Sequence, residues 1–215
     1  MPDIITMPDE LYGFTQTKFN VVTLNTTSGP SSFNPILAIN GPQAQFWALD
    51  LTFTLRDADD ADALARFFLK LKGGKVLARI YDLARVARSG VTQPRGAGGA
   101  GPVVNIAADA LAGADTIVLK NLLPSQAVAL RYQDHLGIGE NLYPIEDSTP
   151  SDSSGEASVK LGIPLWIGVA EGDAVNLVKP TGLFRVTQGD ADLTRGDFYR
   201  SLPLTASFMQ MPDFG

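Results

Sequence analysis

The chain has 215 residues, of which 45% are hydrophobic and 19% are charged, a composition that supports one large or two small cores and excludes an intrinsically disordered chain. Its 17 Lys and Arg against 23 Asp and Glu give a net charge of −6, the wrong sign for sequence-independent binding of nucleic acid. Cysteine is absent, which excludes a disulfide framework and a thiolate zinc site.

The first residues, MPDII, lack the basic and apolar regions of a secretory signal, and no stretch reaches the roughly 18–20 apolar residues that cross a bilayer. We therefore expect synthesis in the cytoplasm and no contact with a membrane. The 21 Gly and 14 Pro fall between short strand-like runs, which is typical of a mainly β chain with many turns.

Three strands are predicted before residue 56, over residues 18–26, 31–40 and 45–55, and together they could form a meander. The third has the clearest period of two. Its apolar face carries Trp47, Leu49, Leu51, Phe53 and Leu55, and its polar face carries Asp50, Thr52 and Thr54. Such alternation indicates a strand with one face buried in a core.

One helix is predicted, over the segment DADDADALARFFLKLKGG that begins at Asp57. Apolar side chains recur there at helical spacing, and Gly73 and Gly74 end the segment. Asp57 is expected to cap the helix. Three more acids lie in its first turns, where the helix dipole favours negative charge: Asp59, Asp60 and Asp62. A strand over residues 75–83 follows.

The sequence changes character at residues 89–102, a Gly-rich stretch that is typical of a linker. Five short strands with polar turns follow, over residues 115–121, 127–133, 141–146, 156–163 and 173–179. Short strands of this kind indicate a small barrel or sandwich. We therefore predict that residues 103–180 form an inserted small β-barrel domain.

The C-terminal part offers strands over residues 183–188 and 201–211, which have no core of their own. They are expected to return to the N-terminal sheet. Residues 1–102 together with 181–215 are therefore predicted to form one β domain with one helix. The expected fold class is mainly β with one α-helix.

No catalytic, cofactor-binding or metal-ligating residue is predicted. His135 is the only histidine and stands in a polar segment, so it is interpreted as a solvated surface residue, and no nucleophile-elbow sequence accompanies it. The four Asp from residue 57 to 62 lack the glycine and distal glutamate of a calcium loop, and helix capping explains them. Residues 96–101 (GAGGAG) lack the Lys-Ser or Lys-Thr of a phosphate loop, which favours a linker.

The aromatic and basic residues leave more than one interpretation open. The alternation places Trp47 in the core, whereas the exposure of Trp166 stays undecided. In one alternative the inserted barrel binds carbohydrate, with Trp166, Tyr132 or Tyr143 as stacking rings. The arginines after the helix have no interleaved aromatic residues and are interpreted as solvating a strand and its loop: Arg79, Arg85, Arg88 and Arg95.

Residues 46–81, which read FWALDLTFTL, then the capped helix, then KVLARIYDL, resemble the tail-tube type fold of long-tailed bacteriophages. The inserted part that follows is similar to distal tail proteins of siphophages, so the resemblance covers roughly residues 46–185. The matching motifs are Pro94-Arg95-Gly96, DSSGEA at residues 152–157, Ile163-Pro164-Leu165, Gly172-Asp173-Ala174-Val175 and Gly182-Leu183-Phe184-Arg185. These motifs are turns and strands, not catalytic signatures.

The resemblance implies a tail-tube-like β-sandwich or split barrel with an inserted small β-barrel. It implies a structural virion protein without enzymatic activity or cofactor, located at the tail tip. The protein would assemble with itself into a ring, usually of six copies, between the tail tube protein and the hub or baseplate protein. DNA would pass through the ring without specific binding.

The net negative charge leads to an expectation about the wall of such a ring. Acidic or neutral residues would let DNA pass, because Lys and Arg are the residues that hold phosphates. The polar face of residues 45–55, with Asp50, Thr52 and Thr54, is the candidate for this wall. The alternative is that this face is buried between neighbouring subunits.

Overall fold

The structure is a computed structural model that describes residues 3–13, 15–24, 27–28, 38–39, 44–54, 58–81, 104–132, 134–189 and 204–211. The described chain is mainly β, which confirms the predicted class. Neither of its α-helices combines the length and the apolar character that a membrane crossing requires.

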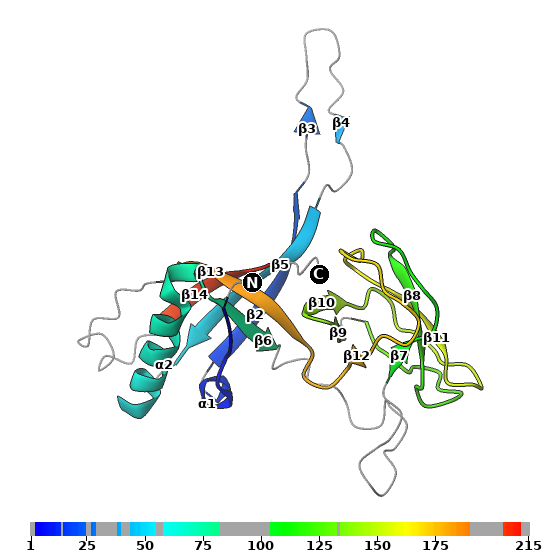
Figure 1. Cartoon of the computed structure of the whole chain (residues 1–215), viewed down its shortest axis with the longest axis horizontal. Coiled ribbons are helices and arrows are strands. Elements are labelled where there is room, and N and C mark those ends of the chain that lie inside the picture. Colours follow the sequence, from blue (N-terminus) through cyan, green and yellow to red (C-terminus); the bar gives the residue numbers. More distant parts are fainter. Residues whose placement is uncertain are drawn as a thin grey trace, which may run out of the picture.

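The largest element is a six-stranded sheet in the order β1-β6-β13-β14-β5-β2 (Figure 1). Its strands are β1 (Ile4–Thr6), β6 (Leu77–Tyr81), β13 (Thr181–Gly189), β14 (Leu204–Gln210), β5 (Ala44–Phe53) and β2 (Thr15–Leu24). β1 runs parallel to β6, and the other neighbours are antiparallel. The C-terminal strands therefore return to the N-terminal sheet, as the sequence predicted.

The predicted three-stranded meander is wrong. β2 pairs directly with β5 over ten residue pairs, because two strands of equal length can pair along their whole length. The chain between them forms a separate pair of two-residue strands, β3 (Thr27–Ser28) and β4 (Ala38–Ile39), which lies apart from the sheet (Figure 1). The rest of the strand predicted over residues 31–40 lies outside the described residues.

The predicted faces of β5 are confirmed. Trp47, Leu49, Leu51 and Phe53 are buried. On the other face, Asp50 and Thr52 are half-buried and Thr54 is exposed. Leu55 lies outside the described residues.

The predicted helix is α2 (Ala58–Leu71), continued by the 3₁₀ turn η1 (Lys72–Gly74). It buries Ala61, Leu64, Phe67 and Leu71. The ring centroid of Phe68 lies 5.9 Å from that of Phe53, so the helix covers the Phe53 end of the apolar sheet face. The proposed cap, Asp57, lies outside the described residues.

The prediction of a single helix is wrong, because Asp9–Tyr12 form a second one, α1. It follows Pro8 and has Asp9 and Glu10 in its only turn, which favours a helix start. A helix this short shows no periodicity in a sequence. Its Tyr12 ring stacks on Tyr81, with centroids 4.0 Å apart.

Residues 104–180, called the insert below, form two three-stranded sheets (green and yellow in Figure 1). One contains β11 (Ala157–Lys160), β8 (Thr116–Lys120) and β7 (Asn105–Ile106), and the other contains β10 (Asn141–Pro144), β9 (His135–Ile138) and β12 (Val175–Asn176). Strands were thus placed correctly near β8, β10, β11 and β12. The strand over residues 127–133 is wrong, since residues 127–132 form turns with one isolated bridge, Leu130 to Thr149.

The insert leaves and rejoins the large sheet at one place, since Tyr81 of β6 pairs with Thr181 of β13. The boundaries of the two predicted domains stay a prediction. Figure 1 shows α2 beside one end of the large sheet and the insert beside the other. The same apolar face of β5 is therefore covered by two different parts of the chain.

Candidate functional site

The histidine singled out in the sequence is a packing residue, so its interpretation as a solvated surface residue is wrong. His135 lies in β9 and is only 5% exposed. Its ring centroid is 5.0 Å from that of Trp47 and 5.7 Å from that of Phe19. Because the strand that it begins is buried on both faces, the histidine is carried into the junction between the insert and the large sheet.

Hydrogen bonds and an ion pair complete this junction. The indole Nε1–H of Trp47 donates to the carbonyl oxygen of Leu142 over 3.1 Å. Arg79 of β6 donates two hydrogen bonds to the carboxylate of Glu140, one from Nε over 2.9 Å and one from Nη2. The hydrogen bonding to Glu140 raises the pKa of the Arg79 guanidinium above its ordinary value. The insert is thus held by apolar packing and by charge together.

The three rings considered as alternatives for carbohydrate stacking differ in their exposure. Tyr143 is 1% exposed, and burial raises the pKa of its phenol. Trp166 is half-buried, and its indole N–H donates to the carbonyl oxygen of Gln45 over 3.2 Å. Only Tyr132 of the three is exposed, at 58%. The core position predicted for Trp47 is confirmed.

The acids of α2 fit helix stabilisation. Asp59 and Asp60 lie in its first turn, where the dipole favours them. Within the described ranges, no three His, Asp or Glu side chains come together as metal ligands would. The glycine stretch at residues 96–101 lies outside the described residues, as do Arg85, Arg88 and Arg95.

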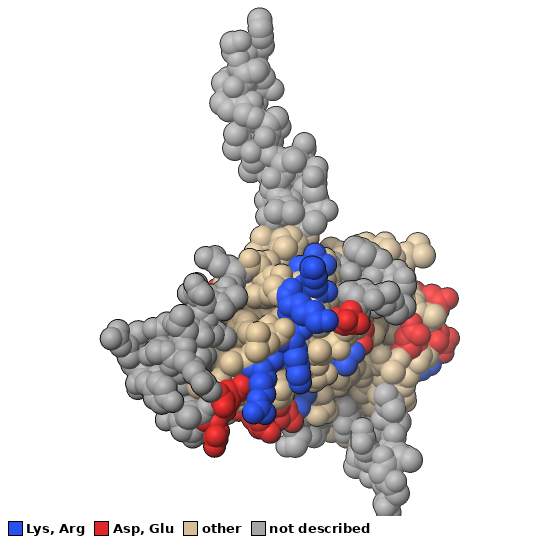
Figure 2. Space-filling view, turned by 60° about the vertical axis from the view of Figure 1, so that its left-hand side comes forward, with Lys and Arg blue, Asp and Glu red and all other residues tan. Residues whose placement is uncertain are grey.

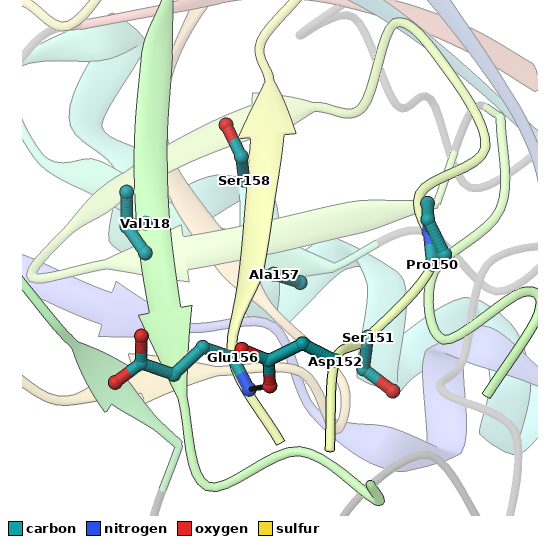
Figure 3. A pocket seen from close by; sticks show the side chains of 7 residues that line it. All are labelled: Val118, Pro150, Ser151, Asp152, Glu156, Ala157 and Ser158. Carbon is teal, nitrogen blue, oxygen red and sulfur yellow. Dashed lines mark hydrogen bonds between the residues drawn. The ribbon is translucent and has the colours of Figure 1, made fainter. Parts of the chain in front are cut away.

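An open hollow of about 360 Å³ lies on the insert, between β8, β11 and the loop before β11 (Figure 3). Asp152 and Glu156 supply its carboxylates. Asp152 accepts hydrogen bonds from the hydroxyl and backbone N–H of Ser154 and from the N–H of Glu156, over 2.7–2.9 Å. The Ser154 hydroxyl makes the largest contribution to lowering the pKa of Asp152. This carboxylate orders its own loop, which is a structural role.

On β2, β5 and β14 the second face of the large sheet is open and carries hydroxyl and charged side chains, whereas Leu77 and Leu183 on its β6 and β13 part are buried. The register places Lys18 of β2 beside Asp50 of β5 and Ser207 of β14. The Ser207 hydroxyl donates to Asp50 over 2.7 Å. In the next row, the hydroxyls of Thr52 and Thr205 lie 3.2 Å apart.

Two arginines extend this face on the other half of the sheet. Arg185 of β13 pairs with Met209, two residues from Ser207, and Arg79 of β6 pairs with Leu183. The charged residues that the described strands place on this face are thus Lys18, Arg79, Arg185 and Asp50. β5 itself contributes acidic and neutral side chains to this face, and the basic ones come from β2, β6 and β13. That the polar side of β5 lines a ring channel stays a prediction. Figure 2 shows Lys and Arg gathered in one strip on the molecule.

The large sheet ends in two unequal edge strands. β1 has three residues, whereas β2 has ten and is the last strand of the sheet in the described part of the chain. Val21 of β2 is 41% exposed. Long edge strands are templates for pairing with a strand of another molecule. No signal in the sequence identifies β2 as an edge, because its alternation is that of any half-buried strand.

Comparisons with protein-family models and with curated proteins give no match to this chain. The surfaces just described and the resemblance of its motifs are therefore the evidence that bears on its function.

Proposed function

We propose that this chain is a structural, non-enzymatic subunit of a ring at the tail tip of a siphophage, between the tail tube protein and the hub or baseplate protein. The observation that carries the proposal is the ten-residue edge strand β2 on a sheet built from both ends of the chain. A structural subunit needs complementary surfaces and no active site, and an extended edge is such a surface.

The two edges of the sheet differ, which bears on the symmetry of the assembly. Contact between the β2 edge of one copy and a different surface of the next is head-to-tail, and such contacts give rings when the rotation closes. Lys18 in the middle of β2 limits indiscriminate pairing, as charges on edge strands commonly do. We infer that β2 pairs with a specific partner surface.

The charge of the open sheet face favours the alternative in which this face contacts protein. Cations lining a channel would hold DNA by its phosphates. Lys18 and Arg185 are exposed on this face, so it is poorly suited to a wall along which DNA must slide. We propose that it lies between proteins of the tail tip.

The test compares two variants that each replace an exposed aliphatic side chain by lysine. Val21→Lys adds a charge to the β2 edge, and Leu69→Lys adds the same charge to α2, where Leu69 is 77% exposed. Closed rings of the wild-type protein and of Leu69→Lys, with assembly lost in Val21→Lys, are expected by mass photometry and electron microscopy. A wild-type protein that stays monomeric at high concentration would contradict the proposal.

A further inference from the structure

The net charge of the chain resides in the insert. Residues 103–180 contain ten Asp and Glu and four Lys and Arg, a net charge of −6, whereas the remaining residues contain thirteen of each kind. Eight of the ten acids of the insert are exposed, and five of these are chosen for the test below: Asp115, Glu146, Asp147, Glu156 and Glu171. The insert is thus an acidic body attached to a neutral remainder.

The open face of the large sheet has the opposite sign. Lys18 and Arg185 lie on it with a single acid, Asp50, while Arg79 on the same face is already paired with Glu140 of the insert. Lys18 and Arg185 are exposed, and the register places Asp50, Ser207 and Met209 between them. Flat surfaces of this kind can bind carboxylates by charge and by hydrogen bonds.

The basic character continues at the end of α2. A Cβ built on Gly74 would lie 2.9 Å from the carbonyl oxygen of Val186 and 3.4 Å from Cγ of Arg185, so the turn at Gly74 packs directly on β13. The lysines on either side of this turn, Lys72 and Lys75, are exposed. They add positive charge next to β13, close to Arg185.

We propose that this basic sheet face docks the acidic insert of a second copy of the chain. The proposal rests on the proposed function, in which copies assemble, and it names the two surfaces that meet. Within one chain the insert packs through Leu142 against Trp47, on the opposite, apolar face of the sheet. The insert also reaches Arg79 on the basic face through Glu140. In the described part of the chain, no carboxylate of the insert pairs with Lys18 or Arg185, and a neighbouring copy can supply one.

The chain already contains one contact of the proposed kind. Arg79 of the sheet binds the carboxylate of Glu140 of the insert through two nitrogens. Paired N–H donors of this type recognise carboxylates with defined geometry. Repetition of such contacts between copies would be head-to-tail, with one face and one insert contributed by each copy.

Two full-length variants, each defective in one surface, test the proposal. The face variant carries Lys18→Glu and Arg185→Glu. The insert variant carries Asp115→Asn, Glu146→Gln, Asp147→Asn, Glu156→Gln and Glu171→Gln. A control with the same change in charge as the face variant, Arg66→Glu with Lys70→Glu, alters exposed positions of α2. Circular dichroism checks folding, and the milder Lys18→Gln with Arg185→Gln replaces a face variant that fails to fold.

Each defective variant alone is expected to associate at least about tenfold more weakly than the wild type. In the face variant the new Glu side chains repel the acids of the insert, and in the insert variant the cations of the face lose their carboxylate partners. The control should associate normally. An equimolar mixture of the two defective variants should form heterodimers, because the insert of one can still dock on the face of the other. Sedimentation or mass photometry with one variant labelled measures this. Association of the wild type should also weaken as salt is added.

The outcomes separate this proposal from the proposed function. Wild-type rings that persist in both defective variants and at high salt overturn the docking and leave the ring intact. Heterodimers in the mixture without closed wild-type rings support the docking and overturn the ring. No association in the mixture overturns the docking. One further result would overturn the docking: the wild type binds a short DNA duplex, the face variant does not, and copies of the chain do not associate. The basic face would then be a phosphate-binding surface.

Discussion

The large sheet and the insert use their strands differently. The sheet has strands of up to ten residues, whereas the longest strand of the insert has five. In the sheet, β5 buries one face and leaves the other open, but β9 and β10 of the insert are buried at every position. The sheet therefore keeps a broad surface for contacts, while the insert presents loops, and those loops carry its charge.

The two parts also depend on different bonds. The sheet is held by continuous ladders between neighbouring strands. The insert depends on loop contacts such as Ser151, whose hydroxyl donates to the Leu123 carbonyl over 2.5 Å and accepts from the Gln126 N–H over 3.0 Å. Such contacts leave no periodic signal in a sequence. The large sheet and the insert should therefore respond differently to truncation and substitution.

The largest effect is expected from removing the insert. Because Tyr81 and Thr181 are paired neighbours, an Asn-Gly turn can join them directly. The shortened chain should unfold cooperatively but lose about 3–6 kcal/mol, since Trp47 and Phe19 lose their cover and burying one large apolar side chain contributes roughly 1.5–3 kcal/mol. Urea unfolding measures this. Loss of all cooperative unfolding would mean that the two parts share one core.

The faces of β5 give the next largest effect. Phe53→Ala should cost about 3–5 kcal/mol, because Phe53 is fully buried and packs on Phe68. Thr52→Ala, on the open face, should cost below about 1 kcal/mol, since it removes one half-buried hydroxyl. The two free energies of unfolding come from the same denaturant titration. Equal costs would show that the assigned faces are wrong.

Two glycines distinguish the junction from the interior of the insert. A Cβ on Gly182 would lie 3.0 Å from Cβ of Leu142 and 3.2 Å from the Phe184 ring, so Gly182→Ala should cost about 1–3 kcal/mol by overpacking. At Gly137 the nearest atom would be 3.4 Å away, on Pro180, and Gly137→Ala should be nearly neutral. Thermal unfolding of the two variants decides whether the insert is packed tightly on the sheet.

The smallest effect concerns pH and the loop of Asp152. Its hydrogen bonds lower the pKa of the folded carboxyl, so they stabilise the loop above the unfolded pKa and this contribution is lost as the pH falls through the lowered folded pKa. Ser154→Ala should move the pKa of Asp152 towards its ordinary value. Carbon-detected NMR titration of the Asp152 side chain measures this pKa in the wild type and in Ser154→Ala. An unchanged titration in Ser154→Ala would contradict the assignment.

Elements could be predicted from the sequence where a strand has one buried face, as in β5. The same holds where a helix is long enough to show its period, as in α2. Asp9–Tyr12 is too short for this. β9 is buried on both faces and therefore has no alternation, which is why His135 was interpreted as a surface residue. Residues 127–132 (AVALRY) form a short apolar run that favours a strand in the sequence, but in the structure they form turns.

The open basic face could not be predicted, for a reason of topology. Lys18, Arg79 and Arg185 are far apart in the chain and share a face only because β2, β6 and β13 enter one sheet in a particular order. Their strands each carry an isolated basic residue, which alone indicates only a solvated position. The positive charge of this face can be recognised only when the strand order and register are known.

Hydrogen exchange of β2 in the unassembled and assembled protein tests most directly whether this edge is the assembly surface. The account predicts that amides within Thr15–Leu24 become protected on assembly, because the outer side of the edge strand gains a pairing partner. Interior strands such as β14 should change little. Assembled rings in which exchange of β2 is the same as in the free subunit would contradict the account.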